Sequence, residues 1–381
     1  MLKKLEKAIN MFSVELCLKT LHDKPEKEKL YYIFENAKKI RNQAITNIAE
    51  ELNLARGTVT RWMELKNIPI QYEFDILKLC KEEIDYSKYS SKQKDQFFTS
   101  KETAEHCYRV FENYAKKNNI NIEDYQYIEP SVGDGAFTAV LPGDTIAIDV
   151  DPKIEGAIIC DYLDWKPEEK KDYIVFGNPP FGLRGHVALK FIEHSYSFAD
   201  YVCFILPQLF ESDGKGSPRK RIKNYNLVHS EKLNCFFHDP DGREMKINVV
   251  FQIWSKYDVN EKYNIKTYDD SLSIVYSMSN GLTTSNQRNT KMIGKCDFYL
   301  PSTCFGENKM RAYKEFEELP GKTIHDKKGY GIVIKKNKAK ILDELLKTDW
   351  NESAFLSTNS AINLRTSNIK EKIQNIFDML K

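Results

Sequence analysis

Metal-binding patterns are absent from this sequence of 381 residues. It contains no CxxC pair and no HExxH run, and its eight cysteines are scattered along the chain. A structural or catalytic zinc site needs closely spaced cysteine and histidine ligands. We therefore expect no metal, and we interpret the cysteines in apolar runs, such as Cys203 in YVCFILPQLF, as reduced core residues in a reducing compartment.

Long apolar runs are absent as well, and we expect no signal peptide. No run approaches the ~20 residues of a membrane-spanning helix, so we expect no membrane partner. The chain also lacks an excess of either charge, with a net charge of +2. This balance does not exclude nucleic acid, because binding depends on where the lysines and arginines lie. A composition of 41% hydrophobic and 29% charged residues is typical of a globular protein.

The first 90 residues contain a helical pattern and no glycine before Gly57. Within them, the stretch 45–67 reads ITNIAEELNLARGTVTRWMELKN. Its apolar residues recur at helical spacing on either side of a short turn at 53–54: Ile48, Ala49, Leu52, Val59 and Trp62. The pattern resembles the helix-turn-helix of phage repressors, and a plain helical bundle is the alternative. The exposed face of the second helix would contact DNA through Arg56, Thr58, Thr60 and Arg61.

The pattern changes after a polar linker at 86–96. Helical segments such as 101–117 and 186–199 alternate with short apolar runs: YQYIEP, TIAIDV, DYIVFG, YVCFILP and INVVFQIW. Strands that alternate with helices predict an α/β fold with a doubly wound, mostly parallel, Rossmann-like sheet. Ligands bind at the carboxyl ends of the strands in such a sheet.

The pattern of helical and strand-like runs becomes weak after about residue 256, where only 338–348 and 367–380 are predicted to be helical. We therefore predict three domains. Residues 1–90 form a helical helix-turn-helix domain, 91–258 form the sheet domain, and 259–381 form a small C-terminal region.

A glycine-rich turn, IEPSVGDGAF at 128–137, follows the first predicted strand of the sheet. Gly133 and Gly135 can adopt positive φ and allow the backbone to approach a ligand closely. The spacing is neither GxGxxG nor GxxxxGK[ST]. A tight structural turn is therefore the alternative to a nucleotide-type site.

Acidic residues follow the next two predicted strands. TIAIDVDP ends in Asp149 and Asp151, and Asp161 follows the third strand in CDYLDW. An acid at the tip of the second strand of such a sheet can bind ribose hydroxyls. Asp161 could accept a hydrogen bond from an adenine amino group. A surface position is the alternative for each acid, but their order at successive strand ends favours binding.

The stretch YIVFGNPPFG at 173–182 places a rigid corner at the end of a strand. Pro179 and Pro180 fix φ at about −65° and remove two backbone donors. The corner therefore presents acceptors, the amide oxygen of Asn178 and the carbonyl of Pro179. Together they can hold an exocyclic NH2 group as a tetrahedral nitrogen whose lone pair attacks a methyl sulfonium. Phe181 can stack on the same base.

Three motifs in order carry a family resemblance. EPSVGDGAF, followed about forty residues later by NPPF, resembles the N6-adenine DNA methyltransferases that use S-adenosylmethionine. FFTS at 97–100 resembles that family's FFTP element, with Ser100 in place of proline. The order is that of the gamma arrangement, which places target recognition after the catalytic core. The resemblance covers roughly 95–256, and the helix-turn-helix is an addition to it.

The resemblance implies roles for individual residues. The cofactor, S-adenosylmethionine, would be bound by Phe97, Thr99, Glu129, Ser131, Gly133, Asp149, Asp161 and Asn178. The target adenine would be held by Asn178, Pro179, Pro180 and Phe181. Leu206 and Pro207 would close the target pocket. Phe237 or Phe251 would stack on the base from the other side, and a core position is the alternative for both.

The predicted reaction is methylation of adenine N6 in double-stranded DNA, with the base flipped out of the duplex. A flexible basic loop would clamp the DNA backbone through Lys215, Arg219, Lys220 and Arg221. A solvated run of charges is the alternative for this loop. A cognate restriction endonuclease and a homodimer are compatible with this function, and we expect a cytoplasmic protein associated with nucleoid or viral DNA.

Two other functions fit the same sequence. An RNA adenine or protein glutamine methyltransferase would have the same core and a different substrate. A non-catalytic DNA-binding regulator would keep the helix-turn-helix and a degenerate core.

Overall fold

The structure, a computed structural model, describes most of the chain. The described residues are 30–35, 44–52, 54–79, 84–90, 93–211, 217–257, 268–304, 310–321, 323–356 and 362–381. The chain divides into two compact units, Met1–Ala199 with His238–Arg243, and Asp200–Phe237 with Glu244–Lys381. The boundaries expected at residues 90 and 258 do not coincide with this division, so the three domains remain a prediction.

Helices form where the N-terminal pattern predicts them. After a helical segment at 30–35 come α3 (Ile45–Glu51), α4 (Arg56–Leu65) and α5 (Glu73–Leu79). The apolar residues that define the pattern are buried together: Ile48, Ala49, Leu52, Val59 and Trp62. Burial of one apolar stripe per helix is what stabilises helices this short.

The connection between α3 and α4 is a tight turn. The Leu54 N–H donates to the Ala49 carbonyl at 2.7 Å, and Leu54 packs against the helical core. Trp62 of α4 contacts Tyr72, with 4.8 Å between ring centroids. Asn53, part of the predicted turn, lies outside the described residues. The assignment of α3 and α4 as a DNA-binding helix-turn-helix remains a prediction.

The central sheet confirms the predicted fold class. Its strand order is β4-β3-β2-β5-β6-β10-β7. The strands are β2 (Gln126–Glu129), β3 (Ile146–Asp149), β4 (Ile158–Ile159), β5 (Tyr173–Gly177), β6 (Ala199–Pro207), β7 (Asn226–Leu233) and β10 (Val249–Ser255). The β2–β3, β2–β5 and β3–β4 pairs are parallel, and β10 is antiparallel to β6 and β7.

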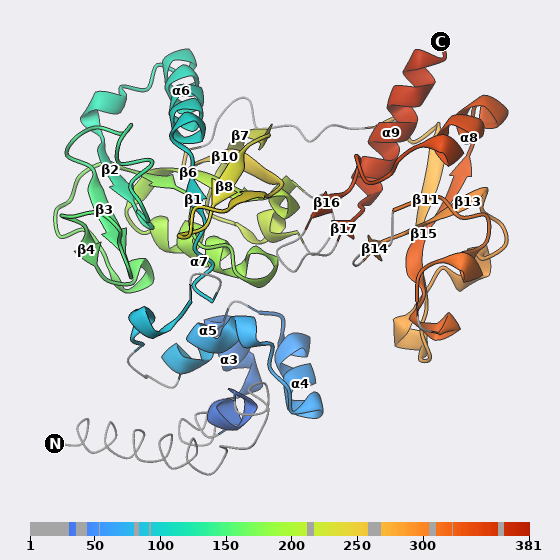
Figure 1. Cartoon of the computed structure of the whole chain (residues 1–381), viewed down its shortest axis with the longest axis horizontal. Coiled ribbons are helices and arrows are strands. Elements are labelled where there is room, and N and C mark those ends of the chain that lie inside the picture. The colour runs from blue at the N-terminus through green and yellow to red at the C-terminus, as the bar shows by residue number, and fades with distance from the viewer. Residues whose placement is uncertain are drawn as a thin grey trace. The chain divides into compact units, whose positions relative to one another are not determined.

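The chain reverses its winding direction at β2. β3 and β4 extend the sheet on one side of β2, where Figure 1 shows the three strands side by side. β5 then pairs with the other side, with Val175 opposite Ile128. In open α/β sheets, ligands bind outside the carboxyl ends of the strands at such a reversal. The turns that follow β2 and β5 are therefore the expected site.

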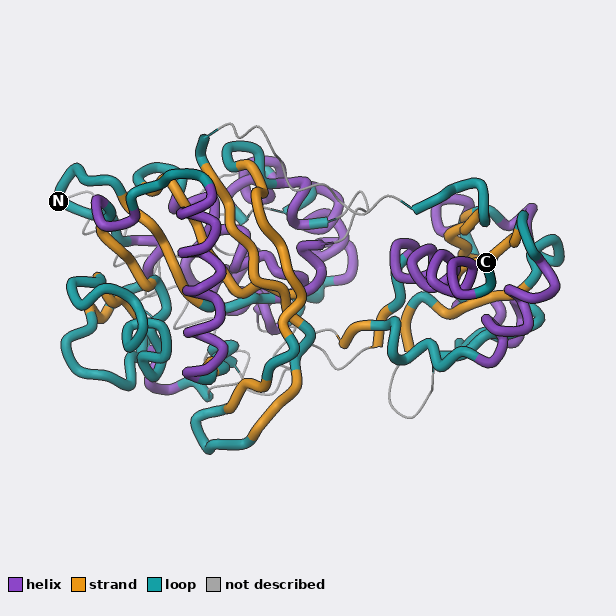
Figure 2. Tube along the Cα trace, turned by 90° about the horizontal axis from the view of Figure 1, so that it is seen from above, coloured by secondary structure: helices purple, strands orange, loops and turns teal. Residues whose placement is uncertain are grey.

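Two helices pack close to this reversal. α6 (Lys101–Lys117) begins after Ser100, whose hydroxyl accepts the Thr103 N–H at 3.2 Å. Its Phe111 contacts Phe176 of β5, with 5.9 Å between ring centroids. Figure 2 shows helices, in purple, running along the strands. α6 therefore covers one face of β5 and supports the residues that follow the strand.

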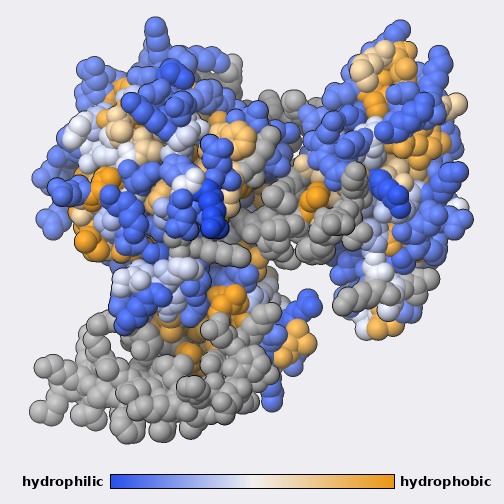
Figure 3. All heavy atoms as spheres, viewed as in Figure 1, coloured by the Kyte–Doolittle hydropathy of each residue, from blue (hydrophilic) through white to orange (hydrophobic). Residues whose placement is uncertain are grey.

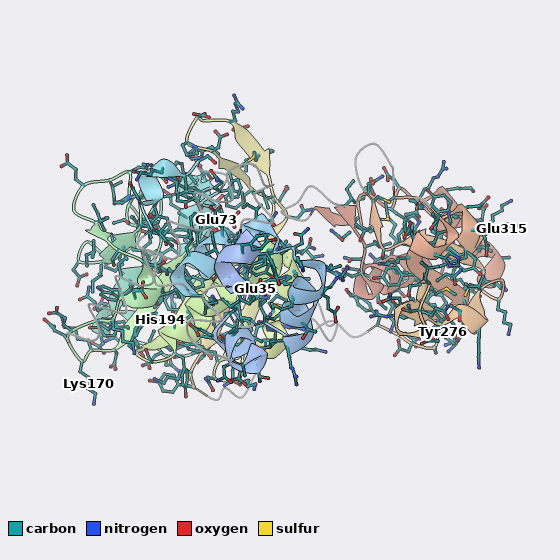
Figure 4. All side chains as sticks on the ribbon, turned by 90° about the horizontal axis from the view of Figure 1, so that it is seen from below. Glu35, Glu73, Lys170, His194, Tyr276 and Glu315 are labelled. Atoms are coloured by element: carbon teal, nitrogen blue, oxygen red, sulfur yellow. The ribbon has the colours of Figure 1, made fainter. Side chains whose placement is uncertain are left out.

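The second helix, α7 (His186–Ser195), is shorter than predicted. It ends at Ser195 rather than at residue 199 because strand β6 begins at Ala199. His194, labelled in Figure 4, hydrogen-bonds the Trp165 carbonyl at 2.7 Å.

A three-stranded sheet joins distant segments in the order β1-β8-β9. These strands are β1 (Phe98–Thr99), β8 (Phe236–His238) and β9 (Glu244–Lys246). His238 lies against Phe98, with 5.6 Å between ring centroids, and hydrogen-bonds Asp134 at 3.1 Å.

The C-terminal residues form a sheet that no run of the sequence predicts. An antiparallel sheet has the order β12-β11-β15-β13, with strands β11 (Ser273–Asn280), β12 (Gln287–Arg288), β13 (Phe298–Pro301) and β15 (Lys328–Ile334). A smaller sheet contains β14 (Thr303–Cys304), β16 (Phe355–Leu356) and β17 (Ile362–Asn363). The two predicted helices are confirmed as α8 (Lys338–Lys347) and α9 (Thr366–Met379). A buried core that includes Ile332, Trp350 and Ile373 joins the sheet to both helices.

Among the described helices, none combines the length and apolar character needed to cross a bilayer. The surface in view in Figure 3 is mostly hydrophilic, with hydrophobic side chains scattered among charged ones.

Candidate functional site

Asn178 follows β5 directly, at the reversal of strand order. Its amide NH2 group donates to the Phe97 carbonyl at 3.3 Å and to the Thr99 hydroxyl at 3.2 Å. Its amide oxygen, Oδ1, is buried and has no hydrogen-bond partner in the described structure. Such an acceptor costs about 1–3 kcal/mol when it is left unpaired. A ligand that donates a hydrogen bond would remove this cost.

The turn after β2 is tied to the same residue. The Ser131 hydroxyl donates to the Asn178 carbonyl at 3.0 Å. Pro179 is buried and Pro180 is half-buried. The backbone of Asn178 is thus fixed by a neighbouring turn on one side and by two prolines on the other. Three predicted site residues, Phe97, Thr99 and Ser131, thus form hydrogen bonds with a fourth, Asn178.

Asp95 holds the next part of the corner, a role that the sequence analysis missed. Its Oδ2 accepts the N–H groups of Phe181 and Gly182, each at 2.8 Å. Burial raises the pKa of the Asp95 carboxyl, and these two hydrogen bonds oppose the rise. Asp95 lies in a polar stretch that reads as a linker, and its position two residues before FFTS is the signal that could have identified it.

Phe181 is 4% exposed, less than its predicted stacking role requires. An aromatic ring can stack on a base only when one of its faces is free. Stacking of Phe181 on an adenine therefore requires that its ring, or the side chains that cover it, move when the base enters.

The glycine-rich turn has the backbone conformation that the sequence predicts. Gly133 and Gly135 have φ of +53° and +88°. A Cβ added to Gly133 would lie 3.0 Å from the ring of Phe98. Only glycine adopts this conformation without strain while the backbone lies this close to β1.

Asp149 connects the turns after β2 and β3. It is buried, and its two oxygens accept the N–H groups of Gly133 and Asp151, each at 2.8 Å. Burial raises the pKa of Asp149, and these hydrogen bonds lower it. An ionised carboxylate has about four acceptor positions, so Asp149 keeps capacity for ribose hydroxyls.

Glu129 is the last residue of β2 and is 1% exposed. The Thr138 hydroxyl donates to its carboxylate. Burial raises the pKa of Glu129 to about 8, and the nearby charges of Asp149 and Asp134 add to the shift. A cation bound beside Glu129 would favour the ionised form. Glu129 is therefore suited to hold a positively charged group of a ligand.

Asp161, the third predicted acid, is already paired. Lys78 of α5 forms an ion pair with it, and the Tyr86 hydroxyl donates to it at 3.2 Å. Its other oxygen accepts the Leu163 N–H at 2.8 Å. An adenine amino group would have to compete with the Lys78 ammonium for this carboxylate.

Gln96 repeats the pattern of Asn178. Its amide NH2 group donates weakly to the Asp151 carbonyl at 3.5 Å, whereas its amide oxygen is buried without a partner in the described residues. No sequence motif predicted this acceptor, which directly precedes the FFTS element.

The predicted DNA-contacting residues of α4 differ in exposure. Arg56 and Arg61 are exposed, whereas Thr58 and Thr60 are half-buried. The Thr60 hydroxyl donates to the Arg56 carbonyl at 3.1 Å. The two arginines are therefore the side chains of this helix that are best placed to meet phosphates.

The predicted basic loop needs a correction. Arg219 is 9% exposed and lies in a 3₁₀ turn, Pro218–Arg221, so it is not a solvated charge on a flexible loop. The turn is anchored by Ser217, whose hydroxyl donates to the Leu209 carbonyl at 3.3 Å. Lys220 is exposed and Arg221 is half-buried, and Lys215 lies outside the described residues.

The aromatic residues proposed for the far side of the target base are in the core. Phe237 and Phe251 are 1% and 0% exposed, respectively, so neither is available to stack on a base. Leu206 is buried and Pro207 is half-buried at the end of β6.

Within the described residues, no group of three or more histidine, cysteine, aspartate or glutamate side chains could hold a metal ion.

No family model and no curated protein matches this sequence. Among solved structures, a presumed RNA methyltransferase from Pyrococcus horikoshii is 19% identical with a TM-score of 0.35, covering 44% of this chain and 90% of its own. A protein from Thermoplasma acidophilum is 18% identical with a TM-score of 0.27, covering 40% of this chain and 85% of its own. Superpositions this weak do not establish a shared substrate or cofactor.

Proposed function

We propose that this chain is an S-adenosylmethionine-dependent methyltransferase that modifies the N6 amino group of adenine in double-stranded DNA. The observation that carries the proposal is the Oδ1 of Asn178, which is buried and has no partner among the described residues, in a Pro-Pro corner at the switch point of the sheet.

The bonding of Asn178 selects the kind of group that binds there. The Phe97 carbonyl can only accept, so turning the amide over would place Oδ1 against another acceptor. The NH2 group therefore stays on the side of Phe97 and Thr99, and Oδ1 is the acceptor that the corner presents. An exocyclic amine satisfies it, whereas a base that presents a carbonyl leaves it unpaired at a cost of about 1–3 kcal/mol. The corner thus favours an amino-bearing base.

The residues of the neighbouring turns fit the proposed cofactor. S-adenosylmethionine, when bound, supplies a methyl group activated on a sulfonium. Glu129, buried with its pKa raised to about 8, would bind the ammonium of the methionine end. Asp149 would use its remaining acceptor capacity for the ribose hydroxyls. Gly133 would allow the backbone to approach the ligand.

Catalysis by this chain would consist of positioning and electrostatics. Asn178 Oδ1 and the Pro179 carbonyl would accept the two amino hydrogens of adenine. This favours the tetrahedral nitrogen and directs its lone pair towards the methyl group. Ser131, by binding the Asn178 carbonyl, would keep the corner in place.

The N-terminal helices support the proposal that double-stranded DNA is the substrate. α4 carries exposed Arg56 and Arg61, which would bind phosphates and orient the duplex. The target base would be flipped into the site at a cost of a few kcal/mol.

Transfer of a radiolabelled methyl group to four substrates tests the proposal. Duplex DNA should be labelled on adenine N6, whereas structured RNA, a glutamine-containing peptide and an adenine-free G·C duplex should not. Asn178→Ala should abolish labelling. The control Asn118→Ala, which makes the same substitution at an exposed asparagine, should not. Labelling of RNA or peptide instead would change the substrate, and DNA binding with no transfer would make the chain a regulator.

A further inference from the structure

A six-residue segment, 94–99, connects the turns that follow β3 and β5, and we call it the strap. The Lys94 ammonium pairs with Asp151 after β3, at 2.5 Å. Asp95 holds the corner after β5, and Phe97 and Thr99 accept the amide hydrogens of Asn178. Nearly every residue of the strap thus contacts a residue at the carboxyl ends of the strands.

We propose that Asp95 is a positioning residue for methyl transfer, because it fixes the direction of the Asn178–Phe181 corner. This inference rests on the proposed function of Asn178. Asp95 would act through the backbone of the corner, whose Phe181 and Gly182 N–H groups it accepts, and not on the reacting groups.

The two prolines make this contact decisive. Pro179 and Pro180 have no N–H, so Phe181 and Gly182 supply the first backbone donors after Asn178. One oxygen of Asp95 accepts both, at 2.8 Å each. Besides Asp95, the described structure holds Phe181 through the Val187 and Ala188 N–H groups at the start of α7, which donate to its carbonyl at 3.2 and 3.4 Å.

The backbone of Asp95 determines which substitutions are informative. Its φ is +55°, a left-handed conformation that strains most side chains. Glycine adopts this conformation freely, so Asp95→Gly removes the carboxylate without adding strain. Asparagine also tolerates it, and Asp95→Asn keeps an oxygen that can accept both N–H groups. The difference between these two variants isolates the acceptor.

We expect Asp95→Gly to lower kcat about 100-fold, the cost of a misplacement of about 1 Å in an active site. The Kd of S-adenosylmethionine should change less than threefold, because the Glu129 and Asp149 turns are untouched. Asp95→Asn should recover kcat to within about fivefold of the unaltered protein. The matched control is Asp85→Ala, which removes an exposed aspartate just before the polar linker that accepts the Ser87 N–H, and it should leave kcat unchanged.

Amide hydrogen exchange of residues 178–187 gives a readout that does not depend on activity. The Phe181 and Gly182 amides should lose protection in Asp95→Gly and keep it in Asp95→Asn. Equal protection and equal kcat in Asp95→Gly would overturn the proposal, as would an Asn variant as impaired as the Gly variant. If the unaltered protein methylates nothing, the proposed function fails, and the exchange data still decide whether Asp95 holds the corner.

Discussion

Asn178 and Asp161 lie after parallel strands of one sheet and differ in whether their side-chain oxygens are free to accept a hydrogen bond from a ligand. Asn178 uses its two amide hydrogens within the protein and keeps a buried oxygen without a partner among the described residues. Asp161 has both oxygens engaged, by Lys78 and Tyr86 on one side and by the Leu163 N–H on the other. Both were predicted to receive an amino group, but only one is ready to accept it.

The difference shows that a residue type at a strand end does not define a site. An acceptor becomes a binding group when its neighbours hold it and leave it unsatisfied. The corner after β5 meets this condition through the strap, whereas the turn after β4 is closed by α5. We therefore expect substitutions to affect turnover most at Asn178 and least at Asp161.

The largest effect should follow from removing the open acceptor. Asn178→Ala should lower kcat by about 1000-fold, the order expected for one preorganised hydrogen-bonding group. The Kd of S-adenosylmethionine, measured by calorimetry, should stay within about threefold. Asp161→Ala should reverse this pattern, with weaker cofactor binding and nearly normal kcat. Equal losses of kcat in the two variants would remove the distinction between the two sites.

Glu129→Gln should give the next largest effect. It removes the charge that would face the ligand ammonium, and the loss of a buried charge partner costs about 2 kcal/mol or more, or about 30-fold in Kd. Titration calorimetry with S-adenosylmethionine at pH 8 measures this change. Unaltered affinity would show that Glu129 does not contact the cation.

The raised pKa of Glu129 also predicts opposite pH trends for binding and stability. Free Glu129 is protonated below about pH 8, so ammonium binding should strengthen as pH rises from 6 to 8. Between its ordinary pKa of 4.5 and about 8, the folded protein holds a proton that the unfolded chain has lost. The free energy of unfolding should therefore decrease as pH rises through this window. In Glu129→Gln the binding trend should be absent and the stability trend should be smaller, because burial also raises the pKa of Asp95 and Asp149.

The N-terminal helices should contribute a smaller, salt-dependent effect. The double substitution Arg56→Ala and Arg61→Ala should weaken duplex binding about tenfold near physiological salt. The slope of log K against log salt should fall by about two, one unit for each lost phosphate contact. Glu64→Ala, on the same helix, is the control. An unchanged salt slope would exclude α4 from the DNA interface.

Lys78→Met should give the smallest effect and tests the closed turn directly. Without the ammonium, an adenine amino group would not have to displace an ion pair. A partly exposed pair of this kind is worth about 1 kcal/mol or less, so cofactor binding should tighten about threefold. Weaker binding in this variant would show that Lys78 orders Asp161 for the cofactor rather than competing with it.

The mostly parallel sheet and helix α6 could be predicted from the sequence because apolar runs and helical periodicity are local patterns. The strand order could not, because it depends on which distant strands pair. The corner residues could be predicted because proline restricts the backbone and glycine allows conformations that other residues avoid. The antiparallel sheet of 273–334 could not be predicted, because its strands show no clear alternation of apolar and polar residues and their pairing is non-local.

The hydrogen bonds and ion pairs of the site could not be predicted from the sequence either. Asp95 contacts Phe181 across 86 positions of sequence, and Lys78 contacts Asp161 across 83. Long-range pairs of this kind leave no trace in local composition. The burial of Arg219 was missed for the same reason, because a run of basic residues reads as solvated until its packing is known.

The most direct measurement is the methylation pattern of DNA from a host that lacks N6-methyladenine, sequenced after the protein is expressed there. The account predicts N6-methyladenine at one short sequence with the unaltered protein and none with Asn178→Ala. Unmodified DNA from cells that contain folded, cofactor-binding protein would contradict it, as would the same marks in both.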